Sequence, residues 1–310
     1  MAAIHVLVDG GAALPLGAAV SYGLTQIAHH VQVGATRFHA GTADPADLNA
    51  ALADPRMAVL PAEFAELGEG YGAAVAMGVA VLSLHAPTRL RGMGAQAAAA
   101  AAAAGLPPER LAVRVLPLLG PGLGMLALHA AEVAQDPIPL TELADAIAAL
   151  AEHLRSETVA MSPERVLAKA AEAGLRVLDR SGADGDGAGA PTSDADGPLC
   201  YRLEATADGD AQLVIVDRCP DLSTAMRQLA ARVLADGRGR AVHLAAASAG
   251  AEPEVAALAT FLDAQLGLAE AWLAPADPLS AWLGGAGSFT VAWYAEAGPP
   301  PNLPPLGGGA

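Results

Sequence analysis

The stretch VAVLSLHAPTRLRGMGAQ, Val79 to Gln96, contains the pattern on which the fold assignment depends. Its first eight residues, Val79 to Ala86, form a short apolar run of the kind found in buried strands. Helical composition begins at Gly94 and continues through eight alanines, Ala97 to Ala104, which are strong helix formers. The segment therefore predicts a strand, a connecting loop and a helix, the unit from which parallel sheets are built.

The same alternation is found on both sides of this segment. IHVLVDGG, from Ile4, and LAVRVLPLLG, from Leu111, are further strand candidates, and helical composition covers Gly124–Ala134 and Leu140–Leu154. Strands separated by helices pair in parallel through crossover connections. The first half of the chain is therefore expected to form an α/β domain.

The second half begins with a change of composition. The segment SGADGDGAGAPTSDADGP, residues 181–198, has too few apolar side chains to pack and is expected to be a flexible loop. A hairpin pattern, YRLEATADGDAQLVIVD from Tyr201, follows it, and then helices alternate with strands. We predict two α/β domains, residues 1–160 and 161–295, and a disordered Pro/Gly tail at 296–310.

Composition and charge exclude several classes of function. The 310 residues include 33 acidic and 17 basic ones, a net charge of −16 that repels nucleic acid and anionic membranes. The sequence contains no stretch of eighteen strongly apolar residues that would predict a membrane span. Its first residues, MAAIHVLVDGG, lack the features of a secretory signal. We therefore expect a cytoplasmic protein. Cys200 and Cys219 do not have metal-binding spacing. We expect neither a metal nor a cofactor.

Arg89 and Arg91 are unusual because they directly precede a predicted helix. The first turn of a helix has unpaired N–H donors and the positive end of the macrodipole, which disfavour nearby cations. Two interpretations remain open. Either both side chains point into water, or an anion binds beside them.

An enzyme is the alternative suggested by LLGPGLGML, Leu118 to Leu126. Its three glycines, Gly120, Gly122 and Gly124, follow a predicted strand and begin a helix, the setting of a nucleotide or phosphate site. The third glycine comes one residue too early for a dinucleotide motif, and no Gly-Lys-Ser/Thr follows. Ser83 and His85 lie on a predicted strand, but there is no Gly-x-Ser-x-Gly motif and no identifiable acidic partner, so the sequence does not indicate a hydrolase.

Four segments match a known family in order along the chain. The first segment, VLVDGGAALP, aligns with the family motif D-S-T-x-D-L-P, and the second, RMAVLPAEF, aligns with T-S-Q-P-S-P-x-x-F. The third segment, TRLRGMGAQ, aligns with S-x-L-S-G-T-Y-Q, and the fourth, LGGAGSF, aligns with H-x-G-P-G-A. The shared positions are Asp9, Leu14, Pro15, Pro61, Phe64, Leu90, Gly92, Gly285 and Gly287. From Ile4 to about Tyr294 the layout resembles the DegV family of bacterial fatty-acid-binding proteins.

The resemblance implies a noncatalytic carrier. Such a protein has two α/β domains that enclose one long-chain fatty acid in a lipid-sized cleft, and it presents this acyl ligand to a separate fatty-acid kinase. In the family, a threonine of the second motif, a serine of the third and the histidine of the fourth hold the carboxylate. By position these become Arg56 or Met57, Arg91 and Leu283, so every expected head-group contact has changed.

The resemblance and the unusual arginines together give a hypothesis of a rewired anion site. Arg91 would pair with a carboxylate, assisted by the Thr88 hydroxyl and the backbone N–H groups of Gly92 and Met93. Further site residues by position are Arg56, Gly285, Gly287 and Ser288. The competing hypothesis is that both arginines are exposed loop charges and that the chain is a protein-binding paralogue without a ligand.

Overall fold

The four strands of the first sheet have the order β2-β1-β6-β7 and pair in parallel throughout. They are β1 (Ile4–Asp9), β2 (Thr25–Ile27), β6 (Ala80–His85) and β7 (Leu111–Val115). All six residues of β6 are buried, as expected of a strand covered on both faces. The predicted parallel pairing of the first half is confirmed.

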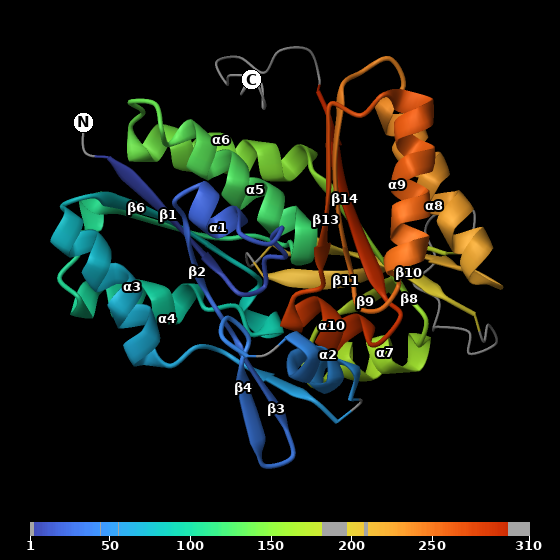
Figure 1. Cartoon of the computed structure of the whole chain (residues 1–310), viewed down its shortest axis with the longest axis horizontal. Helices are drawn as coiled ribbons and strands as arrows, with labels where there is room; N and C mark the ends of the chain where they lie inside the picture. Colours follow the sequence, from blue (N-terminus) through green and yellow to red (C-terminus); the bar gives the residue numbers. More distant parts are fainter. Residues whose placement is uncertain (1–2, 44, 55, 182–196, 208–209, 297–310) are drawn as a thin grey trace.

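Helices cover both faces of this sheet (Figure 1). On one face α3 (Phe64–Met77) packs against α4 (Gly94–Ala103), where Ala97, Ala100 and Ala101 are fully buried. On the other face lie α5 (Gly120–Val133) and α6 (Leu140–His153). The alanine run therefore forms a soluble helix whose small side chains allow close packing on α3.

A small antiparallel sheet was not predicted. It has the order β4-β3-β5 and consists of β3 (His30–Val33), β4 (Thr36–His39) and β5 (Ala58–Leu60), with α2 (Pro45–Ala53) between the last two. Its strands are only three or four residues long, too short for a clear alternation of apolar and polar residues. The β3–β4 hairpin extends away from the rest of the molecule (Figure 1).

The second sheet has seven strands in the order β13-β12-β14-β8-β10-β11-β9. They are β8 (Arg155–Ala160), β9 (Val177–Asp179), β10 (Leu199–Ala205), β11 (Ala211–Arg218), β12 (Val242–Ser248), β13 (Glu270–Pro275) and β14 (Phe289–Ala295). The predicted hairpin is present as β10 and β11. The central strand of this sheet is β8, which lies just before the domain boundary predicted at residue 160.

Helices from both halves of the chain cover the second sheet. On one face, α8 (Leu222–Gly237) and α9 (Glu252–Leu266) pack together, and α7 (Pro163–Glu172) and α10 (Pro278–Gly284) pack together elsewhere. The opposite face from α8 and α9 is covered by α5, which contacts β12 and β14 as well as β1 and β6. Thus α5 lies between the two sheets, and all its residues except Glu132 are buried.

The remaining short elements are α1 (Ala18–Ser21) and the 3-10 turns η1 (Thr88–Leu90) and η2 (Pro108–Arg110). This computed structural model describes every residue except 1–2, 44, 55, 182–196, 208–209 and 297–310. Most of the predicted 181–198 loop and of the 296–310 tail lies outside the described residues. Within the described ranges, none of the helices has the length and apolar composition that a membrane span needs.

Candidate ligand site at the domain boundary

The loop that follows β6 makes a tight turn at Arg91 and Gly92. Arg91 has φ of 64°, a left-handed conformation, and its N–H donates to the Thr88 carbonyl at 3.0 Å. A Cβ atom on Gly92 would overlap the carbonyl oxygen of Ala86, so only glycine fits there. This turn directs both arginine side chains out of the first domain.

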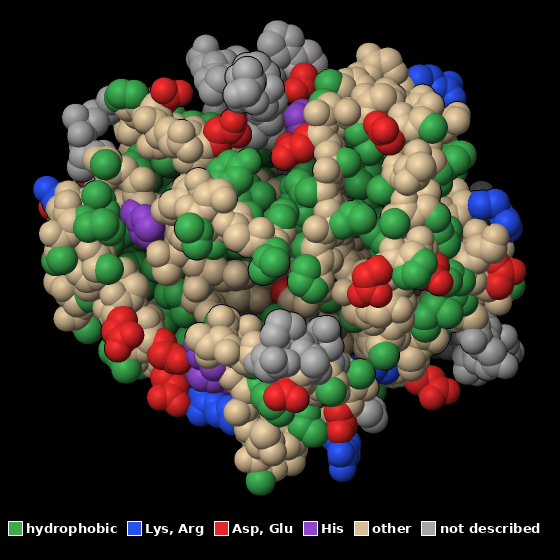
Figure 2. Space-filling model, viewed as in Figure 1, with side chains coloured by type: hydrophobic (Ala, Val, Ile, Leu, Met, Phe, Trp, Pro, Cys, Tyr) green, Lys and Arg blue, Asp and Glu red, His purple; other side chains and the backbone are tan. Residues whose placement is uncertain are grey.

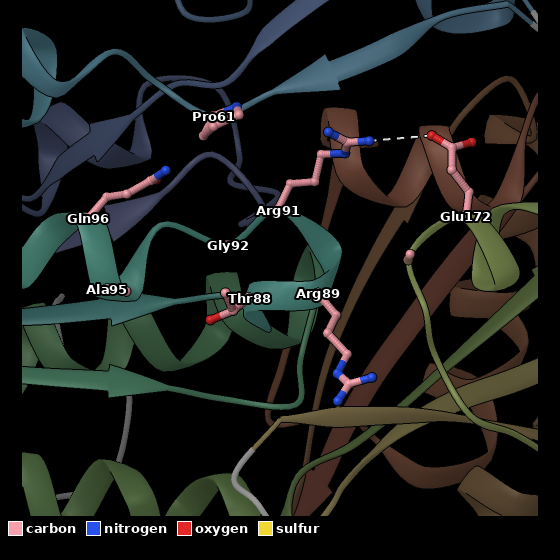
Figure 3. Close-up of a pocket in the computed structure, with 9 residues that line it drawn as sticks. Pro61, Thr88, Arg89, Arg91, Gly92, Ala95, Gln96 and Glu172 are labelled. Atoms are coloured by element: carbon pink, nitrogen blue, oxygen red, sulfur yellow. Dashed lines mark hydrogen bonds and ion pairs between the residues drawn. The ribbon is translucent and has the colours of Figure 1, made fainter.

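Both arginines reach across the domain boundary (Figure 3). Arg89 donates from Nη1 to the Gly174 carbonyl at 2.7 Å and from Nε to Oδ2 of Asp210 at 3.0 Å. Arg91 donates from Nη2 to Oε1 of Glu172 at 3.3 Å. Both side chains therefore have acidic partners in the second domain, and they remain partly exposed, with 45% of the Arg89 side chain and 35% of the Arg91 side chain accessible to solvent.

Trp282 provides a second contact for Arg91. The Cζ atom of Arg91 lies 5.7 Å from the centroid of the indole ring, and Nζ of Lys169 lies 5.1 Å from it. Lys169 also pairs with Oε2 of Glu172 at 2.8 Å. Two cations thus share one carboxylate over an aromatic ring, an arrangement that leaves excess positive charge at this part of an acidic protein.

A pocket of about 390 Å³ opens beside this cluster. Residues from both domains line it: Pro61, Thr88, Arg89, Arg91, Gly92, Ala95, Gln96, Glu172 and Ala173. Its volume is in the range of small-molecule sites. Hydroxyl, amide and guanidinium donors in one wall make the pocket chemically suited to an anionic group.

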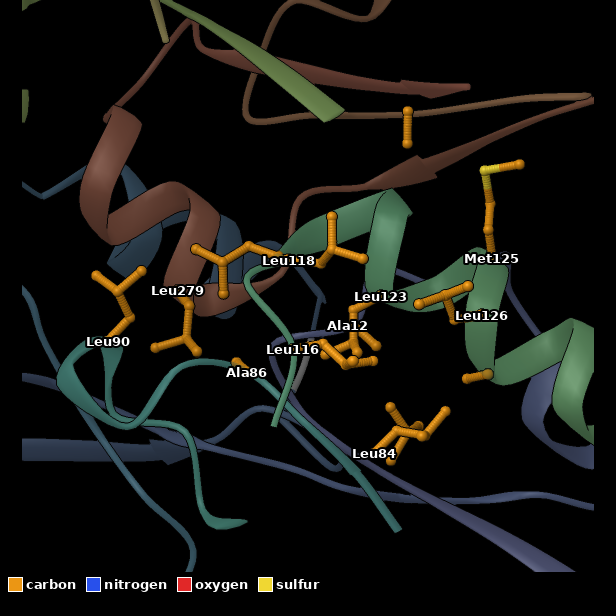
Figure 4. Packing of buried hydrophobic residues seen from close by; sticks show 14 of the residues in the cluster. Ala12, Leu84, Ala86, Leu90, Leu116, Leu118, Leu123, Met125, Leu126 and Leu279 are labelled. Atoms are coloured by element: carbon orange, nitrogen blue, oxygen red, sulfur yellow. The ribbon is translucent and has the colours of Figure 1, made fainter. Parts of the chain in front are cut away.

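Apolar side chains fill the space between the domains near this pocket. Leu90, Leu279 and Trp282 are at most 1% exposed and belong to one buried apolar cluster, of which Figure 4 shows Leu90 and Leu279. A further cavity at the boundary measures only about 20 Å³ and is lined in part by the hydroxyls of Thr158 and Thr290. The 390 Å³ pocket is thus a mainly polar space, and the apolar side chains beside it are closely packed.

Three of the predicted site residues, Thr88, Arg91 and Gly92, line the pocket together. The N–H of Gly92, the predicted donor to the anion, donates to the Pro87 carbonyl at 3.0 Å within the turn itself. The side chain of Met93 is fully buried, and its sulfur accepts the N–H of Ala62 at 3.3 Å.

The other predicted residues do not line the pocket. Arg56 has a 79% exposed side chain that pairs with Asp54 at 2.7 Å. In the turn after α10, Gly287 donates its N–H to the Ala249 carbonyl at 2.7 Å, and the Ser288 hydroxyl donates to the Gly285 carbonyl at 2.6 Å. These bonds fix the end of α10, the helix that brings Trp282 to Arg91.

A buried polar network beneath the pocket contains the acidic partner that could not be identified from the sequence. Nε2 of His85 lies 2.7 Å from Oγ of Ser83, which is also 2.7 Å from the Tyr71 hydroxyl. Nδ1 of His85 lies 3.4 Å from Oδ2 of Asp9, on the adjacent strand β1. All four residues are fully buried, so in this arrangement no substrate reaches Ser83.

The glycines of the segment Leu118–Leu126, which suggested an enzyme, allow the start of α5 to pack closely against the loop after β1. The N–H of Gly120 donates to the Gly11 carbonyl at 2.7 Å, and its own carbonyl accepts from Ala13 at 2.9 Å. A Cβ atom on Gly124 would overlap the Ala13 carbonyl oxygen. Because Gly120 and Gly124 are in contact with the protein's own backbone, they do not form a phosphate cradle.

Comparison with solved structures identifies the fold. A DegV family protein from Thermus thermophilus described as binding fatty acid is 19% identical, with a TM-score of 0.75 over 96% of this chain and 100% of that one. DegV from Bacillus subtilis, described as a fatty acid binding protein, is 15% identical, with a TM-score of 0.72 over 96% and 100%. A DegV family protein from Eubacterium eligens loaded with heptadecanoic acid is 14% identical, with a TM-score of 0.69 over 95% and 100%.

At these identities the likeness shows the fold alone. No family model and no curated protein matches the sequence. The chain therefore has the two-domain α/β fold of the DegV proteins, as the resemblance implied.

Proposed function

We propose that this protein is a noncatalytic lipid-binding protein that holds a fatty acid or a similar acyl anion between its two domains. One observation carries the proposal: Arg91, Thr88 and Gln96 line a pocket at the domain boundary of the DegV fold. Solved proteins with this fold include several described as binding fatty acids. The pocket is therefore assigned to the head group.

The charges around the pocket favour a carboxylate. Arg91 lines the pocket and shares its acidic partner Glu172 with Lys169, so a ligand carboxylate entering the pocket meets a guanidinium whose charge is only partly neutralised. An arginine and a carboxylate form paired, charge-assisted hydrogen bonds, and the side chains of Thr88 and Gln96 add neutral donors. The carboxylate of the ligand would thus pair with the Arg91 guanidinium, either in place of Glu172 or together with it.

The acyl tail would extend among the apolar side chains next to the pocket (Figure 4). Leu90, Leu279 and Trp282 fill this space and would have to move to admit it. Burying a methylene stabilises by about 0.8 kcal/mol, so roughly fourteen methylenes contribute on the order of 11 kcal/mol toward that rearrangement. Met93, buried beside the pocket, has the adaptable side chain that such repacking requires.

The proposal includes a cytoplasmic location and presentation of the ligand to a separate fatty-acid kinase. It requires no cofactor. The net charge of −16 supports a small-molecule ligand over nucleic acid, because phosphate backbones are repelled at long range.

Lipid extraction and titration test this function. The full chain is purified without detergent, extracted and analysed by mass spectrometry for fatty acids. It is then delipidated and titrated with hexadecanoate and with hexadecanol by calorimetry. We expect about one acyl anion per chain and weaker binding of the alcohol. The absence of both a co-purified fatty acid and any heat of hexadecanoate binding would rule out the carrier function.

A further inference from the structure

A separate small cavity lies between the first domain and the edge of the second sheet. It measures about 20 Å³. Three aromatic residues, two glutamates and one histidine form most of its wall: Tyr22, Trp272, Tyr294, Glu132, Glu270 and His129. These side chains come from the end of α1, from α5, and from β13 and β14, so both domains contribute.

The concentration of aromatic rings here is unusual for this chain. The whole sequence has only three tryptophans, four tyrosines and four phenylalanines. One tryptophan and two tyrosines line this single cavity. Aromatic faces carry negative potential and attract cations, which is why rings gather around organic ammonium groups.

The two glutamates add negative charge at the same place. Burial, followed by the charges of Glu270 and Glu132, raises the pKa of the Tyr22 hydroxyl, so both carboxylates act on that ring. Glu270 is partly balanced by His243, whose Nδ1 lies 3.3 Å from Oε2. Among the described residues that line the cavity there is no lysine or arginine. The field inside it therefore favours a cation.

The buried imidazole of His129 indicates that the cavity binds a hydrogen-bond donor. It is 5% exposed, and neither of its ring nitrogens has a hydrogen-bond partner among the residues that the structure describes. Burial lowers the pKa of His129 to about 4, so at neutral pH one ring nitrogen is an acceptor. A buried acceptor without a donor is costly. A cavity of about 20 Å³ has room for one group the size of a water molecule, as an ammonium group is.

We propose that this cavity binds the primary ammonium end of a small aliphatic amine. The three N–H donors of the ammonium group would be directed to the imidazole of His129 and to the carboxylates of Glu132 and Glu270, with the rings around them. The carbon chain would leave past Tyr22, which is 36% exposed. On the face shown in Figure 2, acidic side chains are widespread and basic ones lie mostly near the rim, so cations are attracted at long range.

Calorimetry with 1,4-diaminobutane tests the site directly on the full chain. Butan-1-ol and tetramethylammonium are the controls, because the first lacks the charge and the second is too large for the cavity. We expect saturable binding of the diamine at one site, no binding of the alcohol, and clearly weaker binding of tetramethylammonium. Equal binding of the two cations, or no binding of the diamine at millimolar concentration, would overturn the proposal.

Two variants locate the binding. Glu132→Gln removes one charge, and Tyr22→Leu removes one ring from the partly exposed rim. Glu142→Gln, an exposed position on α6, is the matched control. We expect each test variant to weaken diamine binding by roughly fivefold, the effect of about 1 kcal/mol, and the control to leave it unchanged. Unchanged affinity in both test variants, with wild-type thermal unfolding, would place the amine elsewhere.

A lysine side chain carries the same ammonium group, so Nα-acetyl-lysine amide provides a further comparison. We expect it to bind less tightly than the diamine, whose second charge is attracted to the acidic surface. Tighter binding of the lysine derivative would overturn the small-amine assignment in favour of a protein partner. None of these measurements involves the Arg91 pocket, so they are independent of the fatty-acid titration.

Discussion

The guanidinium of Arg91 donates to the carboxylate of Glu172 across 3.3 Å, and this ion pair connects the first domain to the second. The two arginines beside Gly92 thus have partners in the other half of the chain. Any anion that binds Arg91 has to compete with Glu172 or share the guanidinium with it. Ligand binding and the contact between the domains are therefore linked at this residue.

Replacing Arg91 tests its role as the head-group residue. Arg91→Ala should weaken hexadecanoate binding by roughly tenfold or more, because a hydrogen bond to a charged group contributes about 1.5 to 3 kcal/mol. Binding of hexadecanol should change much less. Arg110→Ala is the control, since that side chain donates to the Gly78 carbonyl and does not line the pocket. Equal losses for acid and alcohol would count against an ion pair with the head group.

Removing the charge of Glu172 should have the opposite effect. Glu172→Gln leaves Arg91 and Lys169 without their shared carboxylate, so calorimetry should show hexadecanoate binding a fewfold more tightly. Glu164→Gln, at an exposed position of the same helix, should leave the affinity unchanged. Weaker binding to Glu172→Gln would show that Glu172 supports the ligand and does not compete with it.

The buried Asp277 predicts a measurable dependence of stability on pH. Burial is the main cause that raises the pKa of its carboxyl to about 7, from an ordinary value of 3.8. Between these values the folded protein binds more protons than the unfolded chain, so the contribution of Asp277 falls as pH rises from about 4 to 7. Asp277→Asn removes this penalty and keeps an oxygen that can accept from the N–H groups of Leu279 and Ser280.

Urea unfolding at several pH values checks this expectation. The stability of Asp277→Asn relative to wild type should increase by up to roughly 1.4 kcal/mol per pH unit within that window, and then level off above pH 7. Asp221→Asn is the matched control because Asp221 begins α8 in the same way, but its pKa is lowered by bonds to Thr224. That variant should gain nothing as pH rises. A pH-independent difference for Asp277→Asn would show that its carboxyl titrates normally.

Two glycine substitutions should differ in sign. Gly92→Ala places a Cβ atom into the Ala86 carbonyl oxygen and should destabilise the protein by about 2 kcal/mol or more. Gly72→Ala lies within α3, where a Cβ atom meets nothing within 4 Å, and should stabilise by up to about 1 kcal/mol. Thermal unfolding measures both. A neutral Gly92→Ala would mean that the loop relaxes easily.

The alternation of strands and helices was predictable because β1, β6 and β7 are short apolar runs between helical segments. The placement of β8 was not, because its sequence RSETVA includes Glu157. That glutamate is 3% exposed and pairs with Arg232 at 2.8 Å, so a charged residue occupies a core position. A buried ion pair removes the apolar signature by which buried strands are recognised.

The candidate site was predictable only in part. Arg91 could be singled out because a cation before a helix is unusual, but its partner Glu172 lies 81 residues further along the chain. The same applies to Asp9, which becomes the neighbour of His85 only when β1 and β6 pair. The sequence also could not show which N–H groups of the loop are available to a ligand, because Gly92 uses its N–H in a hydrogen bond within the turn.

The position of α5 has a consequence for how the molecule unfolds. The helix contacts strands of both sheets, and its one residue that is not buried is Glu132. Neither half can lose its structure without exposing this apolar helix, so melting should be a single cooperative transition despite the two sheets. An isolated fragment ending before Gly120 would lack the element that covers its sheet and should aggregate rather than persist as a stable monomer.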